Sequence, residues 1–78
     1  MTEREIFEWL RHDDERKCVE FCETTPKSAR EISKWINKSI GETGQILERL
    51  ERNKAIEHLA QGWKATELAI KVLNKYFR

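Results

Sequence analysis

Apolar residues recur at helical spacing in the middle of the chain, within residues 28–56. Ile32 and Ile36 lie four residues apart and share one face of a helix. A second group shares a helical face farther along. Its members are Ile46, Leu47 and Leu50. This pattern predicts two short amphipathic helices that bury their apolar stripes against a shared third element.

Two capping boxes predict where these helices begin. Ser28 with Glu31, and Ser39 with Glu42, have the spacing at which a serine hydroxyl accepts the amide of the third helical residue and the glutamate reaches back. Only a few residues remain between the two helices. We therefore expect the first helix to end near Ile36 and the second to begin right after its serine cap, joined by a tight polar turn.

The apolar pattern near the N-terminus predicts a broken helix. Thr2 and Glu5 form a further capping box, so helix should begin almost at once. If it ran unbroken to residue 23, Asp14 would lie inside the apolar stripe, where an unpaired carboxylate is costly. We expect a bend at residues 12–14, with one of its two aspartates capping the next helix. Residues 1–12 would then form an extra arm.

The C-terminal part predicts a short hairpin followed by a helix. Residues 55–59 alternate between apolar and polar positions as a strand does, and Gln61-Gly62 supplies a turn. Residues 63–65 can then return antiparallel to the first strand. Thr66 has the character of a helix N-cap, which predicts a C-terminal helix over residues 66–78.

These elements predict a single domain, residues 1–78, that is mainly α with a small β-hairpin. A helix-turn-helix core would occupy residues 14–56 and a wing residues 55–65, with extra helical segments at both ends. A chain of 78 residues supports one modest core, and 38% hydrophobic with 37% charged residues suits a soluble protein. With no secretory signal or membrane-spanning run visible, we expect a cytoplasmic protein.

The central pattern also resembles a known family. From Glu31 to Ile56 it runs E-I-x2-W-I-x2-S-x6-I-L-x2-L-E-x4-I, followed by the hairpin. This resembles the winged helix-turn-helix domains of bacterial and archaeal transcription regulators, including the MarR and ArsR families, over roughly Glu15 to Phe77. The resemblance implies a three-helix core, a short wing and a regulator that binds double-stranded DNA.

The resemblance places the second helix of the helix-turn-helix in the major groove. There Gln45 is the side chain suited to a bidentate contact with adenine, while basic residues of the helices and wing would contact phosphates. The candidate DNA-binding residues are Lys27, Arg30, Lys34, Lys38, Ser39, Glu42, Thr43, Gln45, Arg49, Arg52, Lys54 and Lys64.

Charge leaves two functions open. Residues 1–25 hold eight acids and four bases, a balance of −4, whereas residues 26–78 hold eleven bases and six acids, a balance of +5. The basic part favours DNA. Glu42 and Glu48 favour an alternative in which the same fold docks a protein, with Ile40 and the neighbouring glycines on the contact surface.

Catalysis, metal binding and cofactors are not expected. Cys18 and Cys22 share a helical face and should be reduced core residues. The two histidines, His12 and His58, do not lie at a customary zinc-site spacing from them. No nucleophile or phosphate loop accompanies the acidic residues, so we do not expect an enzyme.

Aromatic and apolar residues at the two ends suggest a homodimer. Trp63 should anchor the wing to the core, whereas Trp35 could cover the helix-turn-helix or stay partly exposed. Trp9 could contact a partner or pack within the chain. A chain this short can hardly bury all of its terminal apolar residues, so we expect the ends to pair with a second copy. These residues are Ile6, Phe7, Trp9, Leu10, Ile70, Tyr76 and Phe77.

Overall fold

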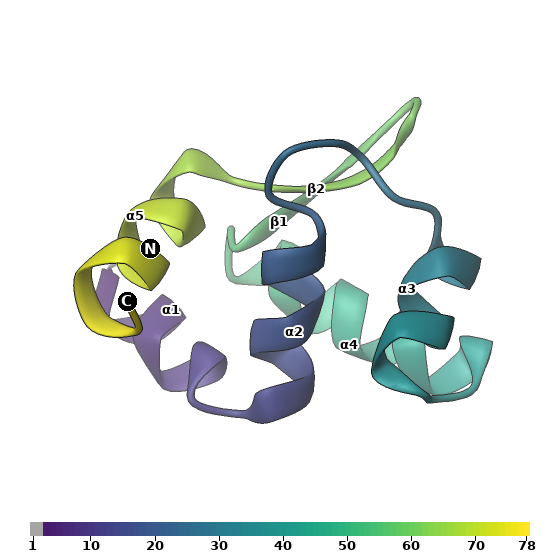
Figure 1. Ribbon diagram of the computed structural model, residues 1–78, viewed down its shortest axis with the longest axis horizontal. Helices are drawn as coiled ribbons and strands as arrows, with labels where there is room; N and C mark the ends of the chain where they lie inside the picture. Colours follow the sequence, from purple (N-terminus) through teal and green to yellow (C-terminus); the bar gives the residue numbers. More distant parts are fainter. Residues whose placement is uncertain (1–2) are drawn as a thin grey trace.

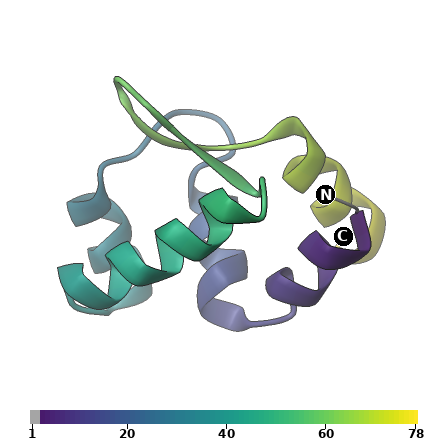
Figure 2. The ribbon, with the colours of Figure 1, turned by 180° about the vertical axis from the view of Figure 1, so that it is seen from behind.

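The computed structural model describes residues 3–78, which form five helices and one antiparallel hairpin (Figures 1 and 2). A mainly α protein with a small β-hairpin is thereby confirmed. Within these residues, no helix has the length and apolar character needed to cross a membrane. The elements are α1 (Glu3–Leu10), α2 (Asp13–Phe21), α3 (Ala29–Ile36), α4 (Ile40–Arg52), β1 (Ile56–Leu59), β2 (Gly62–Ala65) and α5 (Glu67–Tyr76).

Helix α2 runs through the middle of the molecule (Figure 1). In this view α1 and α5 lie on its left, α3 and α4 on its right, and the hairpin extends above it. All five helices contribute to one core because each turns an apolar stripe inward. Its fully buried larger side chains are Ile6, Leu10, Val19, Ile32, Leu47, Leu50, Ile56, Val72 and Leu73.

The N-terminal segment is part of the core, so the prediction of an extra arm was wrong. Ile6 and Leu10 are fully buried. The ring of Phe7 lies 4.9 Å from that of Tyr76 and 5.5 Å from that of Phe77, between centroids. Helix α1 packs against α5, so several of the apolar residues that were expected to need a partner contact one another within the chain. The predicted Thr2 cap lies outside the described residues.

The predicted break at residues 12–14 is confirmed, but its predicted cap was wrong. The N-cap of α2 is His12, whose side chain makes no capping hydrogen bond. Asp13 is the first helical residue, so its carboxylate faces the positive end of the helix dipole and forms an ion pair with Arg16 at 2.7 Å. Asp14, which an unbroken helix would have buried, lies half-buried with its carboxylate 3.7 Å from Nζ of Lys38.

Both predicted capping boxes, at the starts of α3 and α4, are confirmed. The Ser28 hydroxyl accepts from the Glu31 amide at 3.1 Å, and the Glu31 carboxylate accepts from the Ser28 amide at 3.0 Å. The same pair of bonds joins Ser39 and Glu42, at 3.1 and 3.4 Å. Helix α3 ends as predicted because Asn37 adopts a left-handed conformation, with φ of 58°. These local bonds hold α3 and α4 on either side of a short turn.

The hairpin turns one residue earlier than predicted. Its loop consists of residues 60–61, and Gly62 is already the first residue of β2, paired with Leu59. The position requires glycine because φ is +135° and a Cβ would lie 2.7 Å from the carbonyl oxygen of Lys27. That close approach arises because Lys27 and Trp63 exchange two backbone hydrogen bonds, at 2.9 and 2.7 Å.

Burial does not alternate along β1 as the sequence pattern suggested. Ile56 is buried, whereas Glu57, His58 and Leu59 are all exposed. The reason is that the hairpin projects beyond the helical core after its first residue (Figure 1), which leaves the rest of β1 outside the core. The predicted N-cap of α5 is confirmed, since the Thr66 hydroxyl accepts from the Ala69 amide at 3.1 Å.

Candidate nucleic-acid interface

Helix α4 lies at the surface with one long side open, in front of the core in Figure 2. Gly41, Gln45, Glu48 and Arg52 are exposed along it at helical spacing. Gly44 borders this face, and a Cβ added there would meet nothing within 4 Å. The backbone of α4 is therefore accessible over its first turns, with Gln45 as the amide-bearing side chain suited to a base edge.

Thr43 is not on this surface, which corrects its assignment as a DNA contact. Its side chain is 0% exposed, because it lies three and four residues before Ile46 and Leu47 on the buried face of the helix. Ser39 and Glu42 are exposed, but their side chains are engaged in the capping box. The first turn of α4 therefore offers few polar side chains that are available to a ligand.

Four of the candidate basic residues are exposed, and their side chains have no hydrogen-bond or ion-pair partner within residues 3–78. Arg30 and Lys34 lie one turn apart on α3, Arg52 is the last residue of α4, and Lys54 lies two residues after it. These side chains can meet an anion without breaking an internal contact. They stand near opposite ends of the α3–α4 unit, because α4 leads from the turn after α3 to Arg52.

Three candidate lysines already have internal contacts. Lys38 pairs with Asp14 at 3.7 Å, and Nζ of Lys64 donates to the carbonyl oxygen of Glu23 at 3.2 Å. Lys27 donates to the Thr25 hydroxyl, and its Nζ lies 5.0 Å from the centre of the Phe21 ring. Lys64 therefore ties the hairpin to the loop that follows α2, and the predicted phosphate contact of Lys64 would compete with this hydrogen bond. Lys38 keeps much of its side chain in solvent, where an ion pair of this kind is weak.

Arg49 is also held internally. Its Nη2 lies 3.6 Å from Oε1 of Glu15, and its guanidinium lies 5.8 Å from the centre of the Trp9 ring. Because Glu15 is buried, its carboxylate needs a nearby positive charge, and Arg49 supplies that charge. The predicted phosphate contact of Arg49 competes with this structural contact between α4 and α2.

Glu15 itself was missed by the sequence analysis, although a signal was present. It lies three and four residues before Cys18 and Val19, which are both fully buried. A residue at this spacing shares their helical face. A glutamate at such a position on an apolar stripe indicates a buried carboxylate with a cationic partner elsewhere in the chain.

The aromatic residues divide into two groups. Trp63 is half-buried and stacks on His58 across the hairpin, with ring centroids 3.9 Å apart, and its backbone is paired with Lys27. The hairpin is thus held by main-chain bonds to Lys27 as well as by the packing of Trp63 against the core. Trp9 packs within the chain, near His12 and Arg49. Trp35 remains 58% exposed.

The cysteines lie in the core as predicted. Cys18 and Cys22 are both buried and are not joined by a disulfide. Loss of hydration on burial raises the pKa of each thiol to about 12, and the neighbouring thiol of Cys22 acts in the same direction on Cys18. Both therefore stay protonated near neutral pH and are poor nucleophiles.

The residues expected to contact DNA are thus only partly gathered on one surface. The side chains of Arg30, Lys34, Arg52 and Lys54 are exposed, whereas Thr43 is buried and Arg49 is paired with Glu15. Comparison of the chain with models of known families, with curated proteins and with solved structures finds no match.

Proposed function

We propose that this chain is a winged helix-turn-helix protein that binds double-stranded DNA and regulates transcription. The observation that carries the proposal is the pair of uncommitted basic groups, Arg30 with Lys34 and Arg52 with Lys54, near opposite ends of the α3–α4 unit. Helix α4 has 13 residues and is therefore about 20 Å long. The major groove is about 12 Å wide, so cations near both ends of this helix can reach the phosphates on its two sides.

The outward face of α4 supports close approach more than detailed reading of bases. Gly41 and Gly44 present no side chain, so the helix backbone can lie near the floor of a groove. Gln45 can pair with adenine, while Glu48 can accept a hydrogen bond only from an amino group such as that of cytosine. We therefore propose weak sequence preference and binding that depends mainly on phosphate contacts.

The test is a fluorescence anisotropy titration with a blunt mixed-sequence duplex at two salt concentrations. Arg30→Ala should weaken binding to all sequences and lower the salt slope by about 1, since each neutralised phosphate contributes about 0.9 to that slope. Lys71→Ala is the matched control, because Lys71 is an exposed lysine on α5, away from α3 and α4 in Figure 1. Absence of duplex binding at low salt, or equal effects of the two variants, would contradict the proposal.

A protein-docking module is the second candidate, and one specific observation favours it. Ile40 is 53% exposed at the first position of α4, beside Gly41. A large aliphatic side chain next to an open backbone suits an apolar protein partner better than a phosphate. This candidate takes precedence if the duplex titration detects no binding at low salt.

We also propose that the protein acts as a homodimer. One copy offers four uncommitted candidate cations, and a twofold pair would double the number of phosphates contacted. Tyr76, which is 48% exposed on α5, is the large apolar side chain available for pairing at this end of the molecule. Light scattering at micromolar concentration tests this part of the proposal, and a clean monomer mass would remove it.

A further inference from the structure

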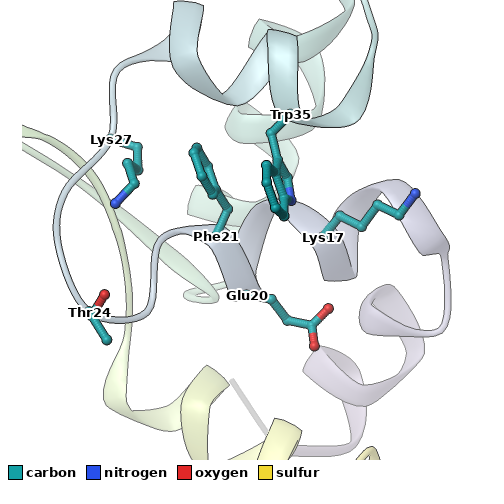
Figure 3. Close-up of a pocket in the computed structure, with 6 residues that line it drawn as sticks. All are labelled: Lys17, Glu20, Phe21, Thr24, Lys27 and Trp35. Atoms are coloured by element: carbon teal, nitrogen blue, oxygen red, sulfur yellow. The ribbon is translucent and has the colours of Figure 1, made fainter.

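A hollow lies between α2, α3 and the loop that joins them (Figure 3). Its volume is about 680 Å³, within the range of pockets that bind small ligands. It lies on the α2 side of α3, whereas the duplex surface proposed above is formed by Arg30, Lys34 and α4. The residues lining it are Lys17, Glu20, Phe21, Thr24, Lys27 and Trp35.

An aromatic stack forms the centre of this hollow. The rings of Phe21 and Trp35 are nearly parallel, 7° apart, with centroids separated by 4.7 Å. Nζ of Lys27 lies on Phe21, 5.0 Å from its centre. Trp35 keeps 58% of its surface in solvent although it rests against Phe21, so the stack ends in an open indole. A flat ring is the chemical group that would extend it.

The charges around the stack favour an anionic ligand. Lys17 and Lys27 lie on either side of the two rings in Figure 3, and Lys17 has no ion-pair partner among residues 3–78. The carboxylate of Glu20 is the opposing charge in the hollow, and it lies 3.9 Å from Nη2 of Arg78. A nucleotide combines a flat ring with a phosphate, which matches an aromatic stack that ends in an open indole and has a lysine on either side.

We propose that this hollow binds an unpaired base of single-stranded nucleic acid. The base stacks on Trp35, and the neighbouring phosphates contact Lys17 and Lys27. An open site suits this ligand because the strand continues on both sides of the bound base. The choice of a nucleic acid over an acidic aromatic peptide rests on the proposed function. The two surfaces together would favour duplexes that carry a single-stranded extension.

The experiment uses an oligothymidylate of about 12 nucleotides, a length that covers one single-strand site. The three tryptophans each give one indole N–H signal in an NMR spectrum, and single Trp→Phe variants assign them. Addition of the oligonucleotide should shift the signal of Trp35 and leave those of Trp9 and Trp63 in place. Trp35→Ala should weaken binding roughly five- to a hundredfold, which is the effect of losing one stacked base.

Matched variants separate stacking from general charge and from loss of fold. Trp35→Phe keeps a ring on Phe21 and should retain part of the affinity. Lys17→Ala should weaken binding, whereas Lys71→Ala on α5 should not. Circular dichroism melting should show that the Trp35 variants stay folded, as expected for a side chain that is mostly in solvent.

A blunt duplex titrated in parallel distinguishes this proposal from the proposed function. If the duplex binds but the oligonucleotide leaves the Trp35 signal unchanged, the stacking site is wrong and duplex binding stands. If the oligonucleotide binds at Trp35 and the duplex does not bind, the stacking site stands and the duplex function fails. A shift of Trp35 by an acidic tyrosine peptide, with no shift by the oligonucleotide, would overturn the choice of ligand.

Discussion

Arg49 on α4 places its Nη2 3.6 Å from Oε1 of Glu15 on α2, and this pair joins two helices across the core boundary. The carboxylate is nearly buried, whereas the arginine side chain is 41% exposed. A group that the sequence suggested for DNA therefore has a structural role. Arg52, one turn farther along α4, has no such partner within residues 3–78 and remains available to a ligand.

The Arg49–Glu15 ion pair predicts that two arginine variants affect different properties, one the stability of the fold and the other duplex binding. Arg49→Ala should lower the free energy of unfolding by about 1–2 kcal/mol, because it leaves the Glu15 carboxylate buried without its charge partner. The effect should be smaller than for a fully buried pair since Arg49 is partly hydrated. Arg52→Ala should change stability by less than about 0.5 kcal/mol and weaken duplex binding instead. Urea unfolding of both variants measures the difference, and equal stability would refute the structural role of Arg49.

Two glycines should respond oppositely to alanine. Gly62→Ala should destabilise the fold by about 1–3 kcal/mol, because φ is +135° and the new Cβ would lie 2.7 Å from the Lys27 carbonyl oxygen. Gly44→Ala should stabilise the fold by up to about 1 kcal/mol, since the site is helical and open. Thermal melting compares the two. Weaker duplex binding by Gly44→Ala would support close approach of the α4 backbone to DNA. A lower melting temperature of Gly44→Ala would contradict the conclusion that the space beside Gly44 is open.

The buried cysteines should be unreactive in the native protein. Burial raises the pKa of both Cys18 and Cys22 to about 12, so the fold favours the protonated thiols. The stabilisation that comes from keeping these thiols protonated is fully present below the ordinary thiol pKa. It is lost as pH rises through about 12. A disulfide reagent at mildly alkaline pH should react slowly with the native protein and rapidly in urea. Fast reaction without denaturant, or a native mass that includes zinc, would contradict this prediction.

The capping box of α3 should make stability depend on acid pH. The backbone amide of Ser28, followed by its side chain, lowers the pKa of Glu31 by hydrogen bonding to the carboxylate. A lowered pKa means that the stabilisation is present above the ordinary carboxyl pKa and is lost as pH falls through the folded value. The melting temperature of wild type should therefore exceed that of Glu31→Gln at neutral pH, with the difference shrinking in acid. Glu48→Gln on the exposed face of α4 is the control, and an equal pH trend in both variants would remove the capping explanation.

Much of the secondary structure could be predicted because its causes are local. Ser28 with Glu31, and Ser39 with Glu42, are three residues apart, so their capping bonds form wherever a helix starts there. The break after Leu10 was likewise predictable from the cost of burying an aspartate in a stripe of apolar residues. The hairpin was placed one residue too late, because the glycine at position 62 is required by its contact with Lys27 and not by the turn.

The candidate site was predicted less completely because it depends on which helix covers which face. Helical spacing alone could assign Thr43 to the buried side of α4, because it precedes Ile46 and Leu47 by three and four residues, yet it was counted among the candidate DNA contacts. Spacing could also have identified Glu15 as buried, although it could not identify its partner. Whether a basic residue is available to a ligand depends on acids and carbonyls that are distant in the chain.

The sequence by itself determined the helix starts, the order of the elements and the split between an acidic first part and a basic second part, because these follow from neighbouring residues and composition. Only the tertiary structure decided that α1 packs on α5, that Arg49 pairs with Glu15, and that Trp35 stacks on Phe21 with its outer side open. Each of these contacts joins different elements. The periodicity of a helix defines its apolar face, but only the packing of the whole chain selects the side chains that cover that face.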